Sequence, residues 1–363
     1  MPAVDWTIIL CILAGAILAP QAGMNGTLGQ LGRNKPFASL WSFTTGMVIL
    51  IIYWLAESHG GKDTDFHATY TDAPWYAHMG GFGGAYYVVM IVYLAPRLGA
   101  GTIMSVSVTS QMAAALIFDH YGALGLERRQ ATAGRIVGLI LSAIGVALIM
   151  LGNDFFRRKV AQDATITNTE VADERALENS AQGKEQMQNE VVVNHPQVSG
   201  PSGPSGPRFD WTVILACLGG ICLALQGAMN GKLGQYSGGG YAAAFSFLEG
   251  WVIIALLFVY DLYFGPQTPK LEPRWSTREV FRTVPWWAWF GGVMGALYVL
   301  AVTVLIPRLG AATVLGTGVC ALVISAVICD HFAWFGLPRT PASIARLVGV
   351  CILVAGVVMI TIL

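Results

Sequence analysis

The sequence predicts an all-α membrane protein of about ten transmembrane helices, arranged as an inverted (antiparallel) 5+5 repeat. Of its 363 residues 55% are hydrophobic and only 12% are Asp, Glu, Lys or Arg, which is about half the charged fraction of a soluble globular protein. Apolar runs close to the roughly 20 residues that cross a bilayer as a helix recur along the chain. They are continuous, without the alternation that a membrane β-barrel requires.

Five predicted spans lie in the first half of the chain and five at matching places in the second half. The first five occupy residues 6–31, 37–56, 75–95, 101–118 and 133–151. The second five occupy residues 211–235, 241–264, 286–306, 311–329 and 343–363.

The two halves also share short motifs, so the chain is a tandem repeat. In order, the first copies are Asp5-Trp6-Thr7, Gln21-x-x-x-Asn25-Gly26, Gly80-Gly81, Pro96-Arg97-Leu98-Gly99 and Asp119-His120. Their counterparts are Asp210-Trp211-Thr212, Gln226-x-x-x-Asn230-Gly231, Gly291-Gly292, Pro307-Arg308-Leu309-Gly310 and Asp330-His331. Because five is an odd number, two five-span copies in series enter the membrane from opposite sides.

The charged residues divide the chain into a first repeat at 1–152, a flexible linker at 153–208 and a second repeat at 209–363. The linker is rich in Gln, Asn, Glu, Pro, Ser and Gly, a composition typical of a disordered tether; a regulatory segment is the alternative. Most Lys and Arg residues fall on the linker's side, which predicts a cytoplasmic linker and external termini.

Glu249 is the one acidic residue well inside a predicted span. A charge there costs roughly 2.5–3.5 kcal/mol on insertion scales, so such residues usually have a function. One interpretation is a carboxylate that couples proton or cation movement to cargo. The alternative is a structural residue near the interface or hydrogen-bonded to Ser246 or a neighbouring helix. Alignment of the copies places Thr45 opposite Glu249, so the acid is not part of the duplicated pattern.

Two amide pairs, Gln21 with Asn25 and Gln226 with Asn230, have the i, i+4 spacing that places both members on one helix face. A buried amide needs hydrogen-bond partners. The four side chains could therefore bind substrate from both halves or hydrogen-bond between helices, and the sequence favours neither alternative. Tyr87 and its counterpart Tyr298 could line a cavity or pack in the core.

The pairs Asp119-His120 and Asp330-His331 close the fourth span of each half. Histidine titrates near neutral pH, so proton relays would suit these positions; helix capping and gate hydrogen bonds would suit them as well. The spacing matches no zinc site. The loop residues His59, Asp63, Asp65 and His67 form a weak metal-binding cluster at best, and no metal or cofactor is predicted.

With its five-span halves, Gln-x-x-x-Asn-Gly pattern, Pro-Arg-Leu-Gly turn and Asp-His pair, the chain resembles the drug/metabolite transporter superfamily. Within it, the chain is similar to the YdcZ-like branch of bacterial five-span proteins, here as a fused tandem of two copies. The resemblance covers both halves and implies an antiparallel bundle with a central cavity between them. Relatives in the superfamily move cations, amino acids, nucleotide sugars and drugs.

These features predict an integral, multi-pass plasma-membrane transporter that moves a small organic solute by alternating access, with proton coupling as an option. A passive channel, a membrane scaffold and a membrane-embedded enzyme are the alternatives, and the absence of a G-x-x-x-x-G-K-[ST] motif disfavours ATP-driven pumping. Its expected partners are the bilayer and the solute. A net charge of zero disfavours nucleic acid, and the fused repeat does not require an oligomer.

Overall fold

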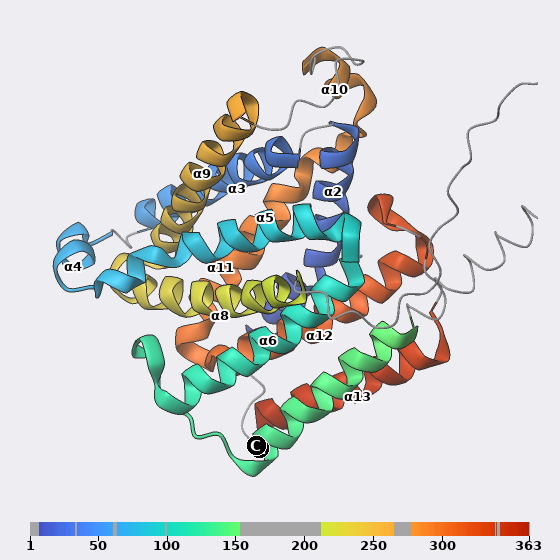
Figure 1. Ribbon diagram of the computed structural model, residues 1–363. Coiled ribbons are helices and arrows are strands. Elements are labelled where there is room, and N and C mark those ends of the chain that lie inside the picture. Colours follow the sequence, from blue (N-terminus) through green and yellow to red (C-terminus); the bar gives the residue numbers. More distant parts are fainter. Residues whose placement is uncertain are drawn as a thin grey trace, which may run out of the picture. The chain divides into compact units, whose positions relative to one another are not determined.

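The part of the chain that the structure describes is folded into α-helices joined by short 3-10 helices and turns (Figure 1). In this computed structural model the described residues are 7–32, 35–60, 64–98, 100–152, 212–264, 277–337, 339 and 342–362. The predicted linker at 153–208 lies outside them.

Helices occupy matching positions in the two halves. The first half contains α1 (Thr7–Ala16), α2 (Leu18–Leu31), α3 (Lys35–His59), α4 (Phe66–Thr71), η1 (Trp75–Met79), α5 (Gly80–Leu98), α6 (Ala100–Tyr121), η2 (Ala123–Gly125) and a helix at Ala133–Gly152 that Figure 1 leaves unlabelled. The second half contains α8 (Thr212–Ser237), α9 (Gly239–Phe264), α10 (Thr277–Thr283), η3 (Trp286–Phe290), α11 (Gly291–Leu309), α12 (Ala311–Phe332), η4 (Trp334–Gly336) and α13 (Ile344–Ile362).

Seven helices among the described residues are long and apolar enough to cross a membrane, judged by length and composition. They are Thr7–Leu31, Lys35–His59, Ala133–Gly152, Thr212–Ser237, Gly239–Phe264, Trp286–Leu309 and Ala311–Phe332. The other three predicted spans coincide with α5, α6 and α13, the last with a shorter apolar stretch at Ile344–Ile360. The all-α class is confirmed, and the count of ten spans stays a prediction.

The first predicted span is interrupted between α1 and α2 at Ile17, whereas its counterpart α8 runs without a break. Pro20 lies in the first turn of α2, where it has no N–H to donate to the carbonyl group of Ala16. The second copy has Leu225 at this position, so the series of backbone hydrogen bonds in α8 is uninterrupted. The sequence difference thus accounts for the different helices.

Helices of one half pack directly on helices of the other. α5 of the first half lies against α8 and α9 of the second, and α11 of the second lies against α2 and α3 of the first. α6 packs on α8, and correspondingly α1 packs on α12. The halves are therefore interleaved, and each builds its interior partly from its partner's helices.

The central helices α3 and α9 contact each other through equivalent Phe–Gly pairs. The ring of Phe43 lies where a side chain on Gly250 would be, and the ring of Phe247 lies where a side chain on Gly46 would be. The two rings meet with their centroids 4.9 Å apart. Because each copy's Phe meets the other copy's Gly in reverse order along the chain, α3 and α9 run antiparallel about an approximate twofold axis.

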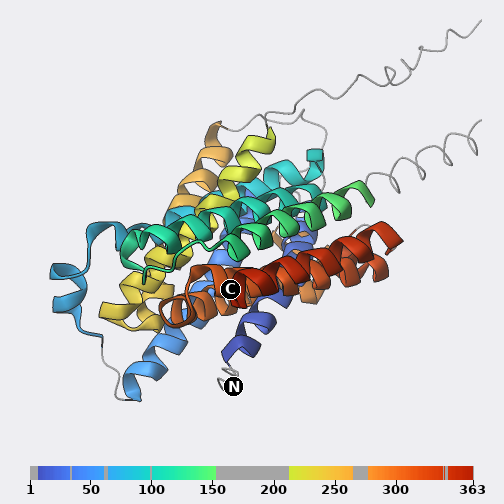
Figure 2. The ribbon, with the colours of Figure 1, turned by 90° about the horizontal axis from the view of Figure 1, so that it is seen from below.

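The last helix of each half repeats this pattern. A Cβ on Gly138 would lie 2.5 Å from the carbonyl oxygen of Gly356, and a Cβ on Gly145 would lie 2.6 Å from that of Gly349; the reverse distances are the same. Glycine is required here because any side chain would force the two backbones apart. Figures 1 and 2 show this helix, in green, alongside α13, in red.

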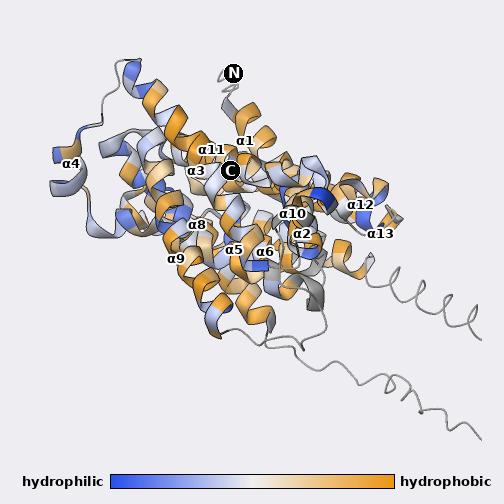
Figure 3. Cartoon of the chain, turned by 90° about the horizontal axis from the view of Figure 1, so that it is seen from above, coloured by the Kyte–Doolittle hydropathy of each residue, from blue (hydrophilic) through white to orange (hydrophobic). Residues whose placement is uncertain are grey.

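The outer surface of the bundle is strongly apolar. Ile52 is 58% exposed, Leu256 66% and Ile344 81%, and hydrophobic residues run along all the long helices in Figure 3. Isolated exposed apolar residues are common on soluble proteins, but an apolar surface of this extent marks contact with lipid. The largest buried apolar cluster lies inside, among residues of α1, α2, α6, the helix at Ala133–Gly152, α8, α11, α12 and α13.

Candidate solute-binding site

The amide pair of α8 packs against a glycine face of the opposite half. Gln226 Nε2 lies 2.6 Å from the position of a Cβ on Gly84, and the Asn230 side-chain oxygen occupies the space beside Gly80. Gln226 Nε2 also donates a hydrogen bond to Ser246 Oγ at 3.3 Å. The Gly80-x-x-x-Gly84 spacing thus leaves room on α5 for two amide side chains from α8.

The amide pair of α2 has the equivalent surroundings. Gln21 Nε2 lies 2.5 Å from the position of a Cβ on Gly295, and the Asn25 oxygen lies beside Gly291. Asn25 Nδ2 donates to Ser42 Oγ at 3.2 Å. Both amide pairs therefore lie between the halves, each facing the glycines of the other half's α5 or α11.

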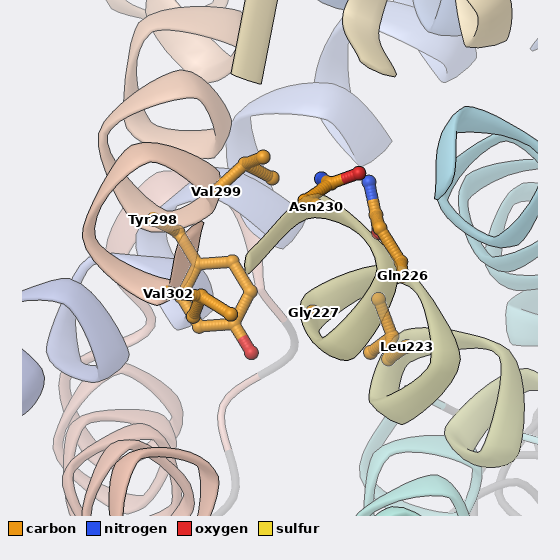
Figure 4. Close-up of a pocket in the computed structure, with 7 residues that line it drawn as sticks. All are labelled: Leu223, Gln226, Gly227, Asn230, Tyr298, Val299 and Val302. Atoms are coloured by element: carbon orange, nitrogen blue, oxygen red, sulfur yellow. The ribbon is translucent and has the colours of Figure 1, made fainter. Parts of the chain in front are cut away.

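A small pocket opens between α8 and α11 at the second amide pair (Figure 4). It is lined by Leu223, Gln226, Gly227, Asn230, Tyr298, Val299 and Val302. Its interior volume is about 10 Å³, which is room for roughly one water molecule. In this conformation the pocket is closed to an organic solute.

Asn230 carries a hydrogen-bond donor without a protein partner at this pocket. The residue is 1% exposed, and none of the described residues accepts a hydrogen bond from its Nδ2. In Figure 4 its amide lies between Gln226 and Val299, at the edge of the pocket. A buried, unpaired amide nitrogen costs about 1–3 kcal/mol, so a water molecule or a ligand oxygen would be stabilised here.

Tyr298, which lines the pocket, has a polar partner that sequence reasoning missed. The side-chain nitrogen of Gln111, on α6, donates to the Tyr298 hydroxyl oxygen at 3.4 Å across the boundary between the halves. Gln111 is buried and interrupts the apolar run at 101–118, while the second copy has Leu322 at the matching position. The sequence feature that could have identified Gln111 is a polar residue, inside a predicted span, that is present in only one copy.

Tyr87, the counterpart of Tyr298, does not line this pocket. Its ring lies 3.3 Å from the position of a Cβ on Gly219 of α8, next to Met90, and it packs with the apolar cluster that contains Met90 and Ala216. The two tyrosines thus have different surroundings in the two halves.

Glu249 lies at the junction of η1 and α5 of the opposite half. The Gly81 N–H group donates a hydrogen bond to Glu249 Oε2 at 2.9 Å. In the first copy Thr45 Oγ1 lies beside Gly292, the counterpart of Gly81, which confirms the alignment of Thr45 with Glu249. Instead of accepting from a backbone N–H, Thr45 donates to the carbonyl oxygen of Trp41 at 3.0 Å.

Asp119 holds the beginning of α12 in the opposite half. Its two oxygens accept the N–H groups of Ala311 at 3.2 Å and Ala312 at 3.1 Å, and its Oδ2 also accepts from Arg135 Nη2 at 3.0 Å. Arg135 further donates to the carbonyl oxygen of Ile360 at 3.2 Å, near the end of α13. These contacts favour the capping role over the relay role.

Asp330 and the two histidines have matching local partners. Asp330 Oδ2 accepts from Arg346 Nη2 at 2.7 Å, with the same sequence spacing as Asp119 and Arg135. His120 Nδ1 accepts the N–H of Ala131 at 3.0 Å, and His331 Nδ1 accepts the N–H of Ala342 at 3.2 Å. Each histidine thus stabilises, by a hydrogen bond, the turn that follows its own helix.

No group of three or more His, Cys, Asp or Glu side chains could hold a metal ion among the residues that the structure describes. In the loop cluster, Asp65 Oδ1 instead accepts the N–H of Ala68 at 3.0 Å and caps α4. His67 is within hydrogen-bond distance of Thr71 on the same helix. Asp63 lies outside the described residues.

Comparison with known proteins places both halves in one family. Residues 6–148 and 211–359 each match the family described as "Putative inner membrane exporter, YdcZ". The inner membrane protein YdcZ of Escherichia coli (strain K12) is 26% identical over 144 residues, which are 39% of this chain and 93% of that protein. The chain therefore belongs to the YdcZ family of drug/metabolite transporters, as a multi-pass membrane protein that contains two family-length copies in tandem.

Proposed function

We propose that this membrane transporter moves a small organic solute by alternating access, with the solute bound in the second half at Gln226, Asn230 and Tyr298. The observation that carries the proposal is the buried Asn230 nitrogen, which has no partner among the described residues and lies at the edge of a pocket. Polar groups that converge on a largely apolar pocket are typical of small-molecule sites.

The proposed solute accepts a hydrogen bond from Asn230 and contacts the Tyr298 ring. The two amides and the phenol provide neutral donors and acceptors, which suit a carbonyl, amide or hydroxyl group. Because the pocket holds about one water molecule, solute binding requires α8 and α11 to separate. The structure then corresponds to a closed state between two open ones.

The proposed alternation uses an inverted arrangement of the two five-helix copies. Its support is the reversed exchange of contacts between Phe43 and Gly250 and between Phe247 and Gly46. If both copies span the bilayer, helices related in this way place the twofold axis in the membrane plane. Rocking of one half against the other about that axis interchanges the surroundings of the two amide pairs, so the site at Gln226 and Asn230 faces first one side of the membrane and then the other.

Glu249 is the proposed coupling group of this cycle. It accepts a hydrogen bond from Gly81, and Gly80 and Gly84 of the same helix contact the amides of Asn230 and Gln226. A change in the charge of the carboxyl group would therefore change its hydrogen bond to α5, the helix that contacts the amide pair. We propose that protonation of Glu249 loosens the contact with α5 and permits the halves to move.

The test of the binding proposal begins with ligand-induced stabilisation of the purified protein across a metabolite library. A compound at 100 times its Kd stabilises the folded state by about 2.7 kcal/mol. Compounds that stabilise the protein are then tested by counterflow in proteoliposomes, where a carrier exchanges labelled for unlabelled solute.

The Asn230→Leu variant should bind such a compound roughly 2- to 10-fold more weakly, the loss expected for one hydrogen bond. The control is Gln235→Leu, which removes an exposed amide from the same helix and should leave binding unchanged. Equal affinity in the Asn230 variant and the control would rule out this site, and binding without counterflow would rule out a carrier.

A further inference from the structure

Aromatic side chains form two equivalent clusters at opposite ends of the α3–α9 pair. In the first cluster His78, Tyr70, Tyr241, Phe245, Trp54 and Phe66 pack together. In the second, Trp289, Phe281, Phe37, Trp41 and Phe258 occupy the matching positions, apart from the counterpart of Phe66.

The two clusters differ in polarity. In the second cluster the Phe281 ring stacks on Trp289 with centroids 4.6 Å apart, and neither ring can take up a proton. In the first cluster Tyr70 stacks on His78 with centroids 5.5 Å apart. The hydroxyl groups of Tyr70 and Tyr241 are also 2.6 Å apart. One end of the bundle thus carries an imidazole and two phenols where the other carries hydrocarbon and indole rings.

His78 has an unused ring nitrogen inside the first cluster. Its Nε2 is shielded from solvent, and none of the described residues forms a hydrogen bond with it. Its ring meets Phe245 edge-on, with centroids 5.8 Å apart. A buried polar atom of this kind is normally satisfied by water or by an exchangeable group.

Two connections link His78 with Glu249. Along α9, Phe245 and Glu249 are four residues apart and therefore share one helix face, with Cβ atoms about 5–6 Å apart. Along the other chain segment, Gly81 follows His78 by three residues, and the Gly81 N–H group binds Glu249. The imidazole therefore packs against Phe245, the residue one helical turn before Glu249 on α9.

We propose that His78 relays protons between Glu249 and the solvent on the α4 side of the molecule, which rests on the proposed coupling role of Glu249. In the inward direction one imidazole nitrogen takes a proton from water, and the other releases its proton to the Glu249 carboxylate through intervening water. The ring ends neutral, and the net change is one proton moved from solvent to Glu249. Trp289, at the matching position, cannot do this, so only one end has the relay.

Most of the other titratable groups near η1 have contacts of their own, and Glu57 of α3 accepts the N–H group of Gly240 at 2.9 Å. Tyr70 and Tyr241 share a hydrogen bond, and Tyr236 of α8 packs near Ala77 with Lys232 Nζ 5.4 Å from its ring centroid. The groups that bond within α4 are Asp65, His67 and Asp72. His78 is distinguished from them by a buried ring nitrogen that has no hydrogen-bond partner among the described residues.

The relay can be tested without knowing the solute, by infrared spectroscopy of the reconstituted full-length protein after a pH jump. The C=O stretch of a protonated carboxylic acid that disappears in Glu249→Gln reports the protonation of Glu249. In His78→Phe, which keeps a ring against Tyr70 and Phe245, this band should reach the same final amplitude about 100-fold more slowly. His78→Gln, which preserves polarity without a titrating group, should be slowed in the same way.

The matched control is Trp289→Phe, an aromatic substitution at the equivalent place in the other half, which should leave the rate unchanged. Size-exclusion profiles and thermal unfolding of each variant separate slow protonation from misfolding. An unchanged rate in both His78 variants would overturn the relay while leaving the role of Glu249 intact. A wild-type protein without any band sensitive to Glu249→Gln would overturn the coupling role and the relay with it.

Discussion

Replacing Asp119 by Ala should destabilise the protein far more than the loss of any exposed ion pair. Asp119 is 1% exposed and accepts hydrogen bonds from Arg135 and from the first two N–H groups of α12. The substitution leaves the Arg135 charge buried and α12 without its cap, and the α12 cap belongs to the other half. The substitution should therefore also weaken the packing between the two halves.

The expected magnitude follows from two contributions. Breaking a buried ion pair from one side costs about 3–5 kcal/mol, and losing a helix cap costs about 1 kcal/mol, so the free energy of unfolding should fall by about 4–6 kcal/mol. The matched comparison is Glu127→Gln, because Glu127 pairs with Arg129 at 3.3 Å with its side chain 76% exposed. That change should cost less than about 1 kcal/mol.

The assay is equilibrium unfolding of the purified protein in mixed detergent micelles, followed by tryptophan fluorescence. Asp119→Asn should lie between the two variants, because the amide oxygen can still accept a backbone N–H. The pair Asp119→Leu with Arg135→Met should cost less than the sum of the two single changes, since no unpaired charge is left behind. Equal stability of Asp119→Ala and Glu127→Gln would refute the reasoning.

Four further predictions follow from the packing, the repeat and the coupling proposal. Gly15→Ala should destabilise the protein by about 1–3 kcal/mol, because the new methyl group would overlap the carbonyl oxygen of Gly318. Gly26→Ala, where nothing lies within 4 Å, should be neutral or stabilising in the same unfolding assay. In a cysteine-free background, Glu127→Cys and Arg339→Cys should react with an impermeant maleimide from opposite sides of the membrane, Glu127→Cys from outside. Labelling from one side only would exclude the inverted repeat. Residues 160–205 should be replaceable by a short flexible linker without loss of membrane insertion, as judged by the yield of monodisperse protein. Glu249→Gln should abolish pH-driven accumulation of solute but preserve exchange at equal concentrations, and unchanged accumulation would return Glu249 to a structural role.

Helix positions could be predicted from the sequence because bilayer thickness and backbone hydrogen bonding leave few alternatives. Apolar length alone located α3 and α9 closely. It could not locate the interruption at Ile17, because the run at 6–31 is continuous in hydropathy. Pro20 is the sequence feature that could have indicated the interruption. The second copy has Leu225 at this position and an unbroken helix, which supports that interpretation.

The partners of the polar residues could not be predicted in the same way. A repeat leaves open whether Gln226 faces the glycines of its own copy or those of the other, since both copies carry the same spacing. The structure pairs it with Gly84 of the other half. The ion pairs could have been predicted from the sequence. Asp119 with Arg135 and Asp330 with Arg346 have the same spacing in each copy, and a repeated spacing between opposite charges indicates a contact.

Positions that differ between the copies carry the information about function that the repeated positions do not. The glycine faces, the amide pairs and the Asp–Arg pairs occur twice, and the glycine faces and amide pairs hold the two interleaved halves together in equivalent ways. Glu249 has Thr45 as its counterpart, and His78 has Trp289. Because an inverted repeat makes the two ends of the bundle equivalent, any directional step must come from such differences. Both differences lie along one short stretch from the first aromatic cluster to the amide pair, and under the proposed alternating-access mechanism that stretch is where the transporter would distinguish one side of the membrane from the other.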